Sequence, residues 1–216
     1  TPGKRLAKQA MALGRKHAEF KDNVFWSLVT TNGTIYDAGN FFALNHPGYT
    51  GGAARGNNDN IYTAVTMSAN ALSVIIGIVA LWEGADADQD LNVRVTDVVA
   101  PIRLQQTAYG LTRADLLPVA YAAGPLGPAA ANGNMPNFLK GKLGVITSHR
   151  LDKSSVTDWY VKTSMPGLLH QVRKGLQFTQ EVQNSGENFL KDVLRYKTSE
   201  RFGRKVVQWR GMALIS

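Results

Sequence analysis

The feature that most constrains the fold is an apolar stripe through the first 30 residues. Apolar side chains and one histidine recur there at spacings of three and four, at Leu6, Ala10, Leu13, His17, Phe20, Val24 and Leu28. Such positions share one face of an α-helix, and the basic residues of the segment fall largely off that face. Pro2 suits a first helical turn and Asn32-Gly33 suits a terminating turn. The sequence therefore predicts one long helix that ends near Thr30.

The next segment, residues 32–60, is rich in glycine and asparagine around short apolar pieces such as Phe41-Phe42. This composition is typical of turns and predicts a long excursion over the surface. The glycines between Gly48 and Gly56 invite comparison with a phosphate-binding loop. They lack the Lys-Ser/Thr pair that reaches phosphate and magnesium in such loops, so we do not expect a nucleotide site.

The middle of the chain combines helix and strand signals. Ser68 can cap a helix that runs to Trp82, and its apolar stripe consists of Leu72, Ile75, Ile76 and Val79. Residues 93–100 read as a valine-rich strand ended by Pro101, and residues 105–111 as a short helix. A strand followed by a helix predicts an α/β layer here.

The last third is predicted to be mainly β-structure. Residues 118–141 are dense in proline, glycine, alanine and asparagine, and such long loops are usually functional or disordered, which makes this one a candidate assembly contact. Strands are predicted at 143–147, 159–163 and 172–178. Alternation from Leu190 to Thr198, a turn at Phe202-Gly203 and a partner strand around Val207 predict a terminal hairpin. Together with the opening helix, these elements predict a mixed α+β fold.

Composition narrows the class of protein. At 216 residues and 44% hydrophobic content, the chain can form one compact unit or two small domains. It has no cysteine, which excludes disulfides and thiolate metal sites and fits a reducing cytoplasm. The longest apolar run, Ala69 to Trp82, is too short to span a membrane, and no secretory signal opens the chain. We therefore expect neither export nor a membrane partner.

The charge of the chain points to a polyanionic partner. The formal net charge is +8 and the isoelectric point is near 9.8, and nucleic acid is the commonest polyanion that basic proteins bind. On charge alone, a merely basic soluble protein fits equally well.

Residues that could carry chemistry are scattered. His17 lies on the apolar stripe and is expected to pack there, while His46 and nearby Asp37 are too few for a metal site. His149 and His170 stand alone. Asp86, Asp88 and Asp90 are spaced like part of a calcium loop but lack its glycine and glutamate. Ser148, His149 and Asp152 have the residue types of a catalytic triad but lack a nucleophile elbow. We expect no catalytic, cofactor-binding or metal site, and a protein that is not an enzyme.

A series of short segments, spread over nearly the whole chain, forms an ordered pattern. It consists of the opening helix, Tyr36 to Phe42 with Asn45-His46-Pro47, Leu91-Asn92-Val93, Asp97 to Pro101, Ala108-Tyr109, Asp158 to Val161, and Phe189 to Lys197 continuing through Arg201-Phe202-Gly203-Arg204 to Trp209-Arg210-Gly211. In this order, the segments resemble the major capsid proteins of tailed phages, and especially the phage Mu-like major head subunits. Members of this family usually carry an N-terminal arm and an extended loop before the spine helix. Neither can be placed in this sequence, and no crosslinking residue of the family can be matched.

The resemblance implies the tailed-phage capsid fold. In it, residues 1–63 and 166–216 would form a peripheral domain from the spine helix, its following loop and the terminal strands, and residues 64–165 an inserted axial domain. Many copies would assemble into hexamers and pentamers of an icosahedral shell around packaged double-stranded DNA, held by sequence-independent phosphate contacts. The implied location is the virion capsid, and the host cytoplasm during assembly, with scaffold, portal or decoration proteins as further partners.

Arginine and tryptophan are enriched at the energetic centres of protein interfaces. The candidates for contacts between subunits are therefore Arg195, Arg201, Arg204, Trp209 and Arg210. An equally weighted alternative is a solvated hairpin face with Trp209 in the core. Two other functions remain open, an encapsulin-like compartment that holds protein cargo and a stand-alone basic nucleic-acid-binding protein. A soluble hydrolase ranks last.

Overall fold

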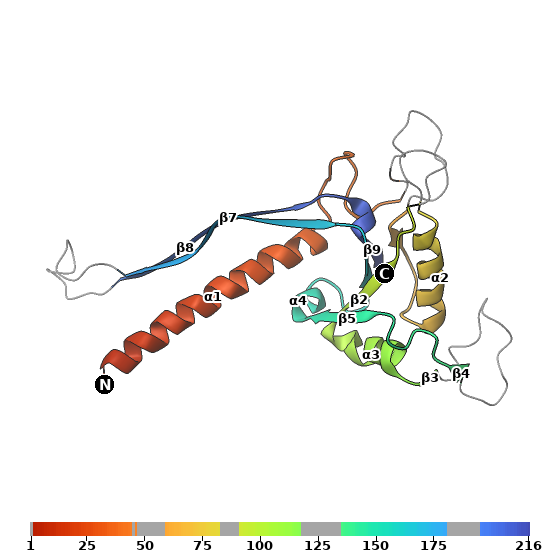
Figure 1. The fold of residues 1–216 in the computed structure, drawn as a ribbon, viewed down its shortest axis with the longest axis horizontal. Coiled ribbons are helices and arrows are strands. Elements are labelled where there is room, and N and C mark those ends of the chain that lie inside the picture. Colours follow the sequence, from red (N-terminus) through yellow and green to blue (C-terminus); the bar gives the residue numbers. More distant parts are fainter. Residues whose placement is uncertain (1, 45, 47–58, 83–90, 118–134, 181–194) are drawn as a thin grey trace. The chain divides into compact units, whose positions relative to one another are not determined.

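The computed structural model describes residues 2–44, 46, 59–82, 91–117, 135–180 and 195–216 (Figure 1). Its helices and strands, in chain order, are α1 (Pro2–Thr30), β1 (Ile61–Tyr62), α2 (Ala69–Ala80), β2 (Val95–Pro101), the 3-10 helix η1 (Ile102–Leu104), α3 (Gln105–Arg113), β3 (Leu116–Leu117), β4 (Met135–Pro136), β5 (Gly144–Ser148), α4 (His149–Asp152), β6 (Trp159–Thr163), β7 (Leu168–Gln180), β8 (Tyr196–Val206), the 3-10 helix η3 (Trp209–Gly211) and β9 (Met212–Ile215). The mixture of helix and strand agrees with the predicted α+β class.

The chain divides into two compact units. The first joins residues 1–28 to residues 169–205, and the second consists of residues 29–168 and 206–216. The first unit therefore contains most of α1 together with β7 and β8, and the second contains the remaining elements. The assignment of a peripheral and an axial domain by place in a shell stays a prediction.

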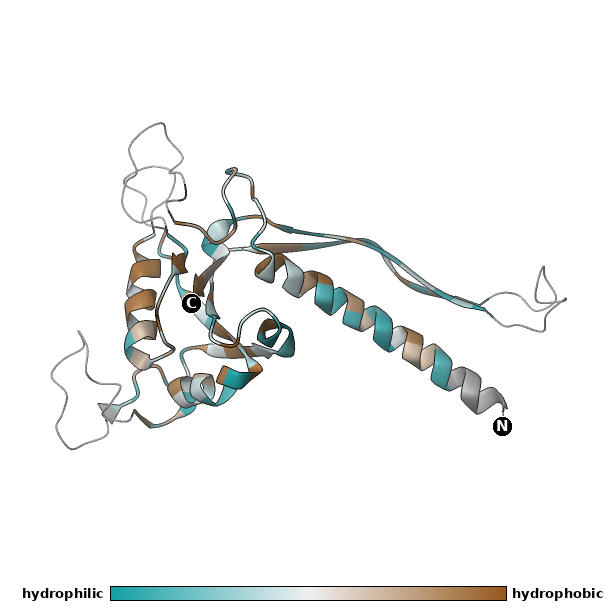
Figure 2. Ribbon diagram, turned by 180° about the vertical axis from the view of Figure 1, so that it is seen from behind, coloured by the Kyte–Doolittle hydropathy of each residue, from teal (hydrophilic) through white to brown (hydrophobic). Residues whose placement is uncertain are grey.

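The long opening helix is confirmed, and it ends at Thr30 as predicted. Asn32 follows in the left-handed region with φ of 50°, a conformation that asparagine tolerates better than most residues. Its side chain exchanges two hydrogen bonds with the backbone of Phe42, at 2.9 and 2.6 Å. Figure 2 shows hydrophilic and hydrophobic residues alternating along α1, as an amphipathic helix requires.

The strands of the first unit, β7 and β8, form a two-stranded sheet. His170 near the start of β7 bonds Arg204 near the end of β8, and Phe178 near the end of β7 stacks on Tyr196 at the start of β8. The two strands therefore run antiparallel as a hairpin, here called the β7–β8 hairpin, which lies beside α1 (Figure 1).

The predicted terminal hairpin with a turn at Phe202-Gly203 is wrong. Both residues lie inside β8, which runs without interruption to Val206 and pairs with β7. The reason is that Glu200, Phe202 and Arg204 alternate as one continuous strand face and all contact α1. These contacts hold the chain straight where Phe-Gly in isolation favours a turn. Residues 190–194 of the predicted strand lie outside the described residues.

The second unit is built on a five-stranded mixed sheet in the order β1-β9-β6-β2-β5. The outer pairs, β1 with β9 and β2 with β5, are parallel, and the central pairs are antiparallel. η1 and α3 connect the parallel neighbours β2 and β5, because parallel strands need a crossover between them. The predicted strands at 143–147 and 159–163 and the predicted α/β layer are thereby confirmed.

The helix α2 begins as predicted. The Ser68 hydroxyl accepts a hydrogen bond from the Ala71 amide at 3.1 Å and caps the helix. Its buried residues, Ala69, Leu72, Ile75 and Val79, repeat at helical spacing, and its ribbon is largely hydrophobic in Figure 2. This face joins a core that contains three fully buried tryptophans, Trp82, Trp159 and Trp209.

The described part of the predicted surface excursion after α1 has both exposed and buried residues. Tyr36 and Leu44 are 59% and 62% exposed, as predicted, but the Phe41-Phe42 pair anchors the segment in the core. Phe41 and Phe42 are 0% and 2% exposed, and Phe42 packs on Tyr160 of β6 with ring centroids 5.5 Å apart. The backbone of this segment can be buried because asparagine side chains satisfy it. Asn32 bonds the backbone of Phe42, and Asn60 bonds that of Phe41 and Ala43.

Candidate interaction surfaces

The five residues expected at contacts between subunits fall into both units. Arg195 precedes β8, and Arg201 and Arg204 lie on it, in the first unit. Trp209 and Arg210 belong to η3 in the second unit. The five residues therefore do not belong to one hairpin, and whether each contacts a neighbouring subunit stays a prediction.

Arg204 is engaged within its own unit. Its guanidinium lies over the rings of Phe25 and Phe202, 5.6 and 5.2 Å from their centroids. Nε donates to the His170 ring at 2.8 Å, and a terminal nitrogen donates to the Lys21 carbonyl. Arg204 therefore fastens α1 to both strands of the hairpin.

A charged cluster fixes the same unit four residues earlier on β8. The Glu200 carboxylate receives hydrogen bonds from His17 at 2.6 Å and from Lys21 at 2.8 Å, and its side chain is 3% exposed. The bonds from His17 and then Lys21 hold the pKa of Glu200 below its ordinary value. His17 on the apolar stripe is therefore a hydrogen-bond partner of Glu200 rather than an apolar packing residue. Sequence reasoning missed Glu200, because its partners lie more than 170 residues away.

Trp209 lies in the core of the second unit. Its indole is 1% exposed, stacks on the His46 ring with centroids 4.6 Å apart, and meets Trp82 edge-on at 5.1 Å. The Arg210 guanidinium covers the indole at 4.3 Å. Burial lowers the pKa of Arg210 from its ordinary value.

A cluster of buried polar side chains, Asp37, His46 and Asn60, here called the polar knot, lies beside this stack. His46 Nδ1 lies 2.8 Å from an oxygen of Asp37, and Nε2 lies 3.0 Å from the side-chain oxygen of Asn60. The Asn60 amide nitrogen donates to three carbonyls, those of Phe41, Trp209 and Met212, at 2.7 to 3.1 Å. Both nitrogens of the imidazole are thus occupied, so the knot holds the segment after α1 against the chain's last strand and presents no open ligand position. No local pattern marks Asn60 in the sequence.

Ser148 and Asp152, which are of the residue types found in catalytic triads, bond backbone amides instead. The Ser148 hydroxyl caps α4 by accepting from the Arg150 amide, and Asp152 accepts from the amides of Ile102 and Arg103 at 3.0 and 3.3 Å. Asp86, Asp88 and Asp90 lie outside the described residues. Within the described part of the chain, no group of three or more potential metal ligands comes together, and no helix is long and apolar enough to cross a membrane.

The most unusual surface is the β7–β8 hairpin. All residues of the 13-residue strand β7 except the first are exposed. Its large apolar side chains Leu169, Val172, Leu176 and Phe178 are 48% to 54% exposed. A two-stranded hairpin is marginally stable in water unless a helix or further strands cover it, and apolar area on this scale usually marks an interface.

The charge of the chain is divided unequally between the units. Counted on the sequence, the first unit holds 14 of the 24 lysines and arginines and 6 of the 16 aspartates and glutamates, which leaves it at +8. The second unit holds ten of each sign and is formally neutral. The entire net positive charge of the chain therefore belongs to the unit made of α1 and the hairpin.

Comparison with known proteins identifies the family of the chain. Residues 5–215 match the sequence model of a family described as phage capsid protein. No curated protein matches the chain. Because the match covers almost all of the sequence, the chain belongs to the phage capsid protein family and is a structural protein of the virion shell.

Proposed function

We propose that this chain is the major head protein of a tailed phage, of the Mu-like type, and that it assembles into the hexamers and pentamers of an icosahedral shell around packaged DNA. The observation that carries the proposal is the exposed β7–β8 hairpin. In a shell, neighbouring copies cover one another's edges, so strands that are unstable alone become buried. A monomeric protein has no equivalent means of covering β7.

The proposed role is geometric and not catalytic. The buried His46 bonds Asp37 through one ring nitrogen and Asn60 through the other, in a closed arrangement. Such a knot gives rigidity, which a subunit needs if many copies are to meet at fixed angles. In this role, α1 acts as the spine helix of a peripheral domain, and residues 64–165 form the axial domain near the capsomer centre. Scaffold, portal and decoration proteins would be the further partners during assembly in the host cytoplasm.

The charge distribution supports DNA as the content of the shell. DNA presents about one negative charge per 1.7 Å of helix axis, and basic protein surfaces bind it without reading its sequence. The +8 charge on one unit provides such a surface. A compartment for protein cargo would have no need of this concentration of positive charge.

Electron microscopy of the purified full-length protein tests the proposal, combined with nuclease digestion of the particles. Closed shells or capsomer rings with protected DNA are the expected result. Shells filled with protein would move the assignment to an encapsulin-like compartment. A protein that binds DNA but stays monomeric at high concentration would be a stand-alone nucleic-acid-binding protein, and the capsid role would be rejected.

A further inference from the structure

Alternation along the β7–β8 hairpin sorts its side chains onto two faces. Contacts between His170 and Arg204 and between Phe178 and Tyr196 place even-numbered residues of both strands on one face. Glu200, Phe202 and Arg204 on this face contact α1. The even face therefore carries the aromatic residues and the described acidic residue of the hairpin.

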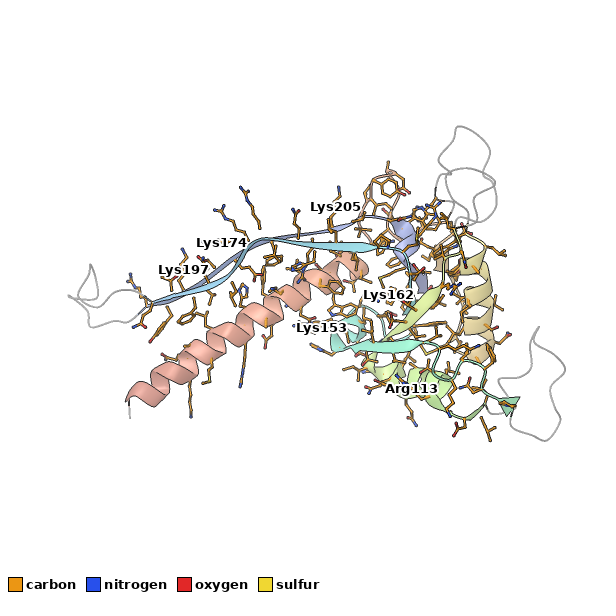
Figure 3. The ribbon with its side chains drawn as sticks, in the orientation of Figure 1. Arg113, Lys153, Lys162, Lys174, Lys197 and Lys205 are labelled. Carbon is orange, nitrogen blue, oxygen red and sulfur yellow. The ribbon has the colours of Figure 1, made fainter. Side chains whose placement is uncertain are left out.

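The odd-numbered face is basic and polar. It carries Arg173 on β7 and Lys197, Arg201 and Lys205 on β8, all of them exposed. Figure 3 shows Lys197 and Lys205 pointing from the hairpin to the side away from α1. Within the described residues, no ion pair neutralises any of these four cations. The other described positions of this face hold polar residues or glycine, apart from Leu169.

The strand register brings two of these charges together. If the contacts named above join directly opposite residues, both fit one antiparallel register, and that register places Arg173 opposite Arg201. Like charges at directly opposite positions destabilise a strand pair, and a bound anion removes that repulsion. Lys197, Arg201 and Lys205 follow one another at intervals of four residues, about 13 Å along an extended strand. The result is a row of cations that suits a linear polyanion.

We propose that this odd-numbered face, defined by Arg173, Lys197, Arg201 and Lys205 and here called the basic face, is the surface that contacts duplex DNA through its phosphates. The inference rests on the proposed function and names the DNA-facing side of the subunit. A second protein is the less suitable occupant, because protein interfaces place aromatic and apolar residues at their centre and this face has none there. The exposed apolar residues of the even face, Val172, Leu176 and Phe178, remain for contacts between subunits. Arg201, expected from the sequence at a subunit contact, is assigned to DNA instead.

The test uses the full-length protein before assembly and a 30-base-pair duplex of arbitrary sequence, labelled for fluorescence anisotropy. The basic-face variant is Arg173→Gln, Lys197→Gln, Arg201→Gln and Lys205→Gln. The matched control removes the same charge from exposed residues of the second unit with Arg94→Gln, Arg103→Gln, Arg113→Gln and Lys153→Gln (Arg113 and Lys153 are labelled in Figure 3). Binding constants are measured over a range of salt concentrations.

Four lost phosphate contacts should make the slope of log affinity against log salt shallower by about 3 to 4 in the basic-face variant. The control should keep the wild-type slope. An unchanged slope in the basic-face variant, or an equal loss in the control, would overturn the assignment. If the variant binds DNA normally but no longer forms capsomers, the face is a subunit contact and the assignment is wrong. Failure of the wild type to form any shell would reject the proposed function instead, and the binding slopes would still decide the DNA surface.

Discussion

The imidazole of His46 lies parallel to the indole of Trp209, with ring centroids 4.6 Å apart and planes inclined by 1°. The imidazole therefore packs its ring face on the indole and bonds Asp37 and Asn60 of the polar knot through its two nitrogens. It joins the segment after α1 to η3 near the end of the chain. The second unit is therefore closed by contacts between residues more than 150 positions apart.

Replacing Asn60 with alanine should open this knot. The substitution leaves the carbonyls of Phe41, Trp209 and Met212 without their amide donor in a fully buried site, and unsatisfied buried groups are costly. We expect a loss of about 3 kcal/mol in the free energy of unfolding of the second unit. Urea unfolding followed by tryptophan fluorescence measures it. The exposed control Gln106→Ala on α3 should change little, and equal midpoints for the two variants would contradict the role of Asn60.

Backbone packing near the same place gives a second prediction. A Cβ built on Gly167 would lie 2.8 Å from the Cα of Gly211, so the two glycines approach each other too closely for side chains. Gly211→Ala must push rigid backbone apart, and we expect at least about 3 kcal/mol of destabilisation or little folded protein. Gly110→Ala is the control, because nothing lies within 4 Å of its added Cβ in the helix α3. There, alanine should stabilise by about 0.5 to 1 kcal/mol. The thermal midpoint of each variant is compared with that of wild type. An unchanged midpoint for Gly211→Ala would disprove the close approach.

Local patterns in the sequence predict the elements that depend on local chemistry. The helix that ends at Thr30, the Ser68 cap and the strand at 159–163 all follow from spacing or capping within a few residues. The strand partner of β8 does not. Phe202-Gly203 reads as a turn in isolation, and the contacts of Glu200, Phe202 and Arg204 with α1 show why the strand continues.

Buried polar contacts escape sequence reasoning for the same physical reason. Asn60 bonds Trp209 and Met212 across about 150 residues of chain, and Glu200 bonds His17 across 183. Neither side chain differs in its local surroundings from an ordinary surface residue. Net charge, by contrast, is visible in the sequence, but its concentration in one unit becomes visible only when residues 1–28 are known to fold with residues 169–205.

The Glu200 cluster predicts a specific dependence on pH. The pKa of Glu200 is lowered in the folded state, so its contribution to stability is present above the pKa of the unfolded carboxyl, about 4.3, and is lost as the pH falls through the lower folded value. The difference in thermal midpoint between wild type and Glu200→Gln should be constant from about pH 5 to 6 and should shrink below about pH 4.

Circular dichroism of the α1 helix follows this transition. Glu19→Gln is the matched control, since Glu19 lies on the same helix and meets Lys16 at 3.7 Å on an exposed surface. Exposed pairs contribute little, so the control should show almost no dependence on pH over this range. If the difference in thermal midpoint between wild type and Glu200→Gln grew as the pH fell, its sign would contradict a lowered pKa of Glu200.

Assembly itself should depend on the apolar face of the hairpin. Leu176 is 54% exposed, although α1 of its own unit lies beside the hairpin. Burial of a leucine side chain at a subunit contact stabilises by about 1.5 to 3 kcal/mol, so Leu176→Lys should raise the protein concentration needed for assembly by about tenfold or more. Light scattering against concentration measures that threshold. Leu81→Lys, at an even more exposed leucine of the second unit, provides the comparison and should assemble near the wild-type concentration.

Because Leu176 makes few contacts within its own chain, the thermal midpoint of the unassembled Leu176→Lys protein should match wild type. A lower midpoint with an unchanged assembly threshold would place Leu176 in the subunit's own fold and remove the hairpin from the interface.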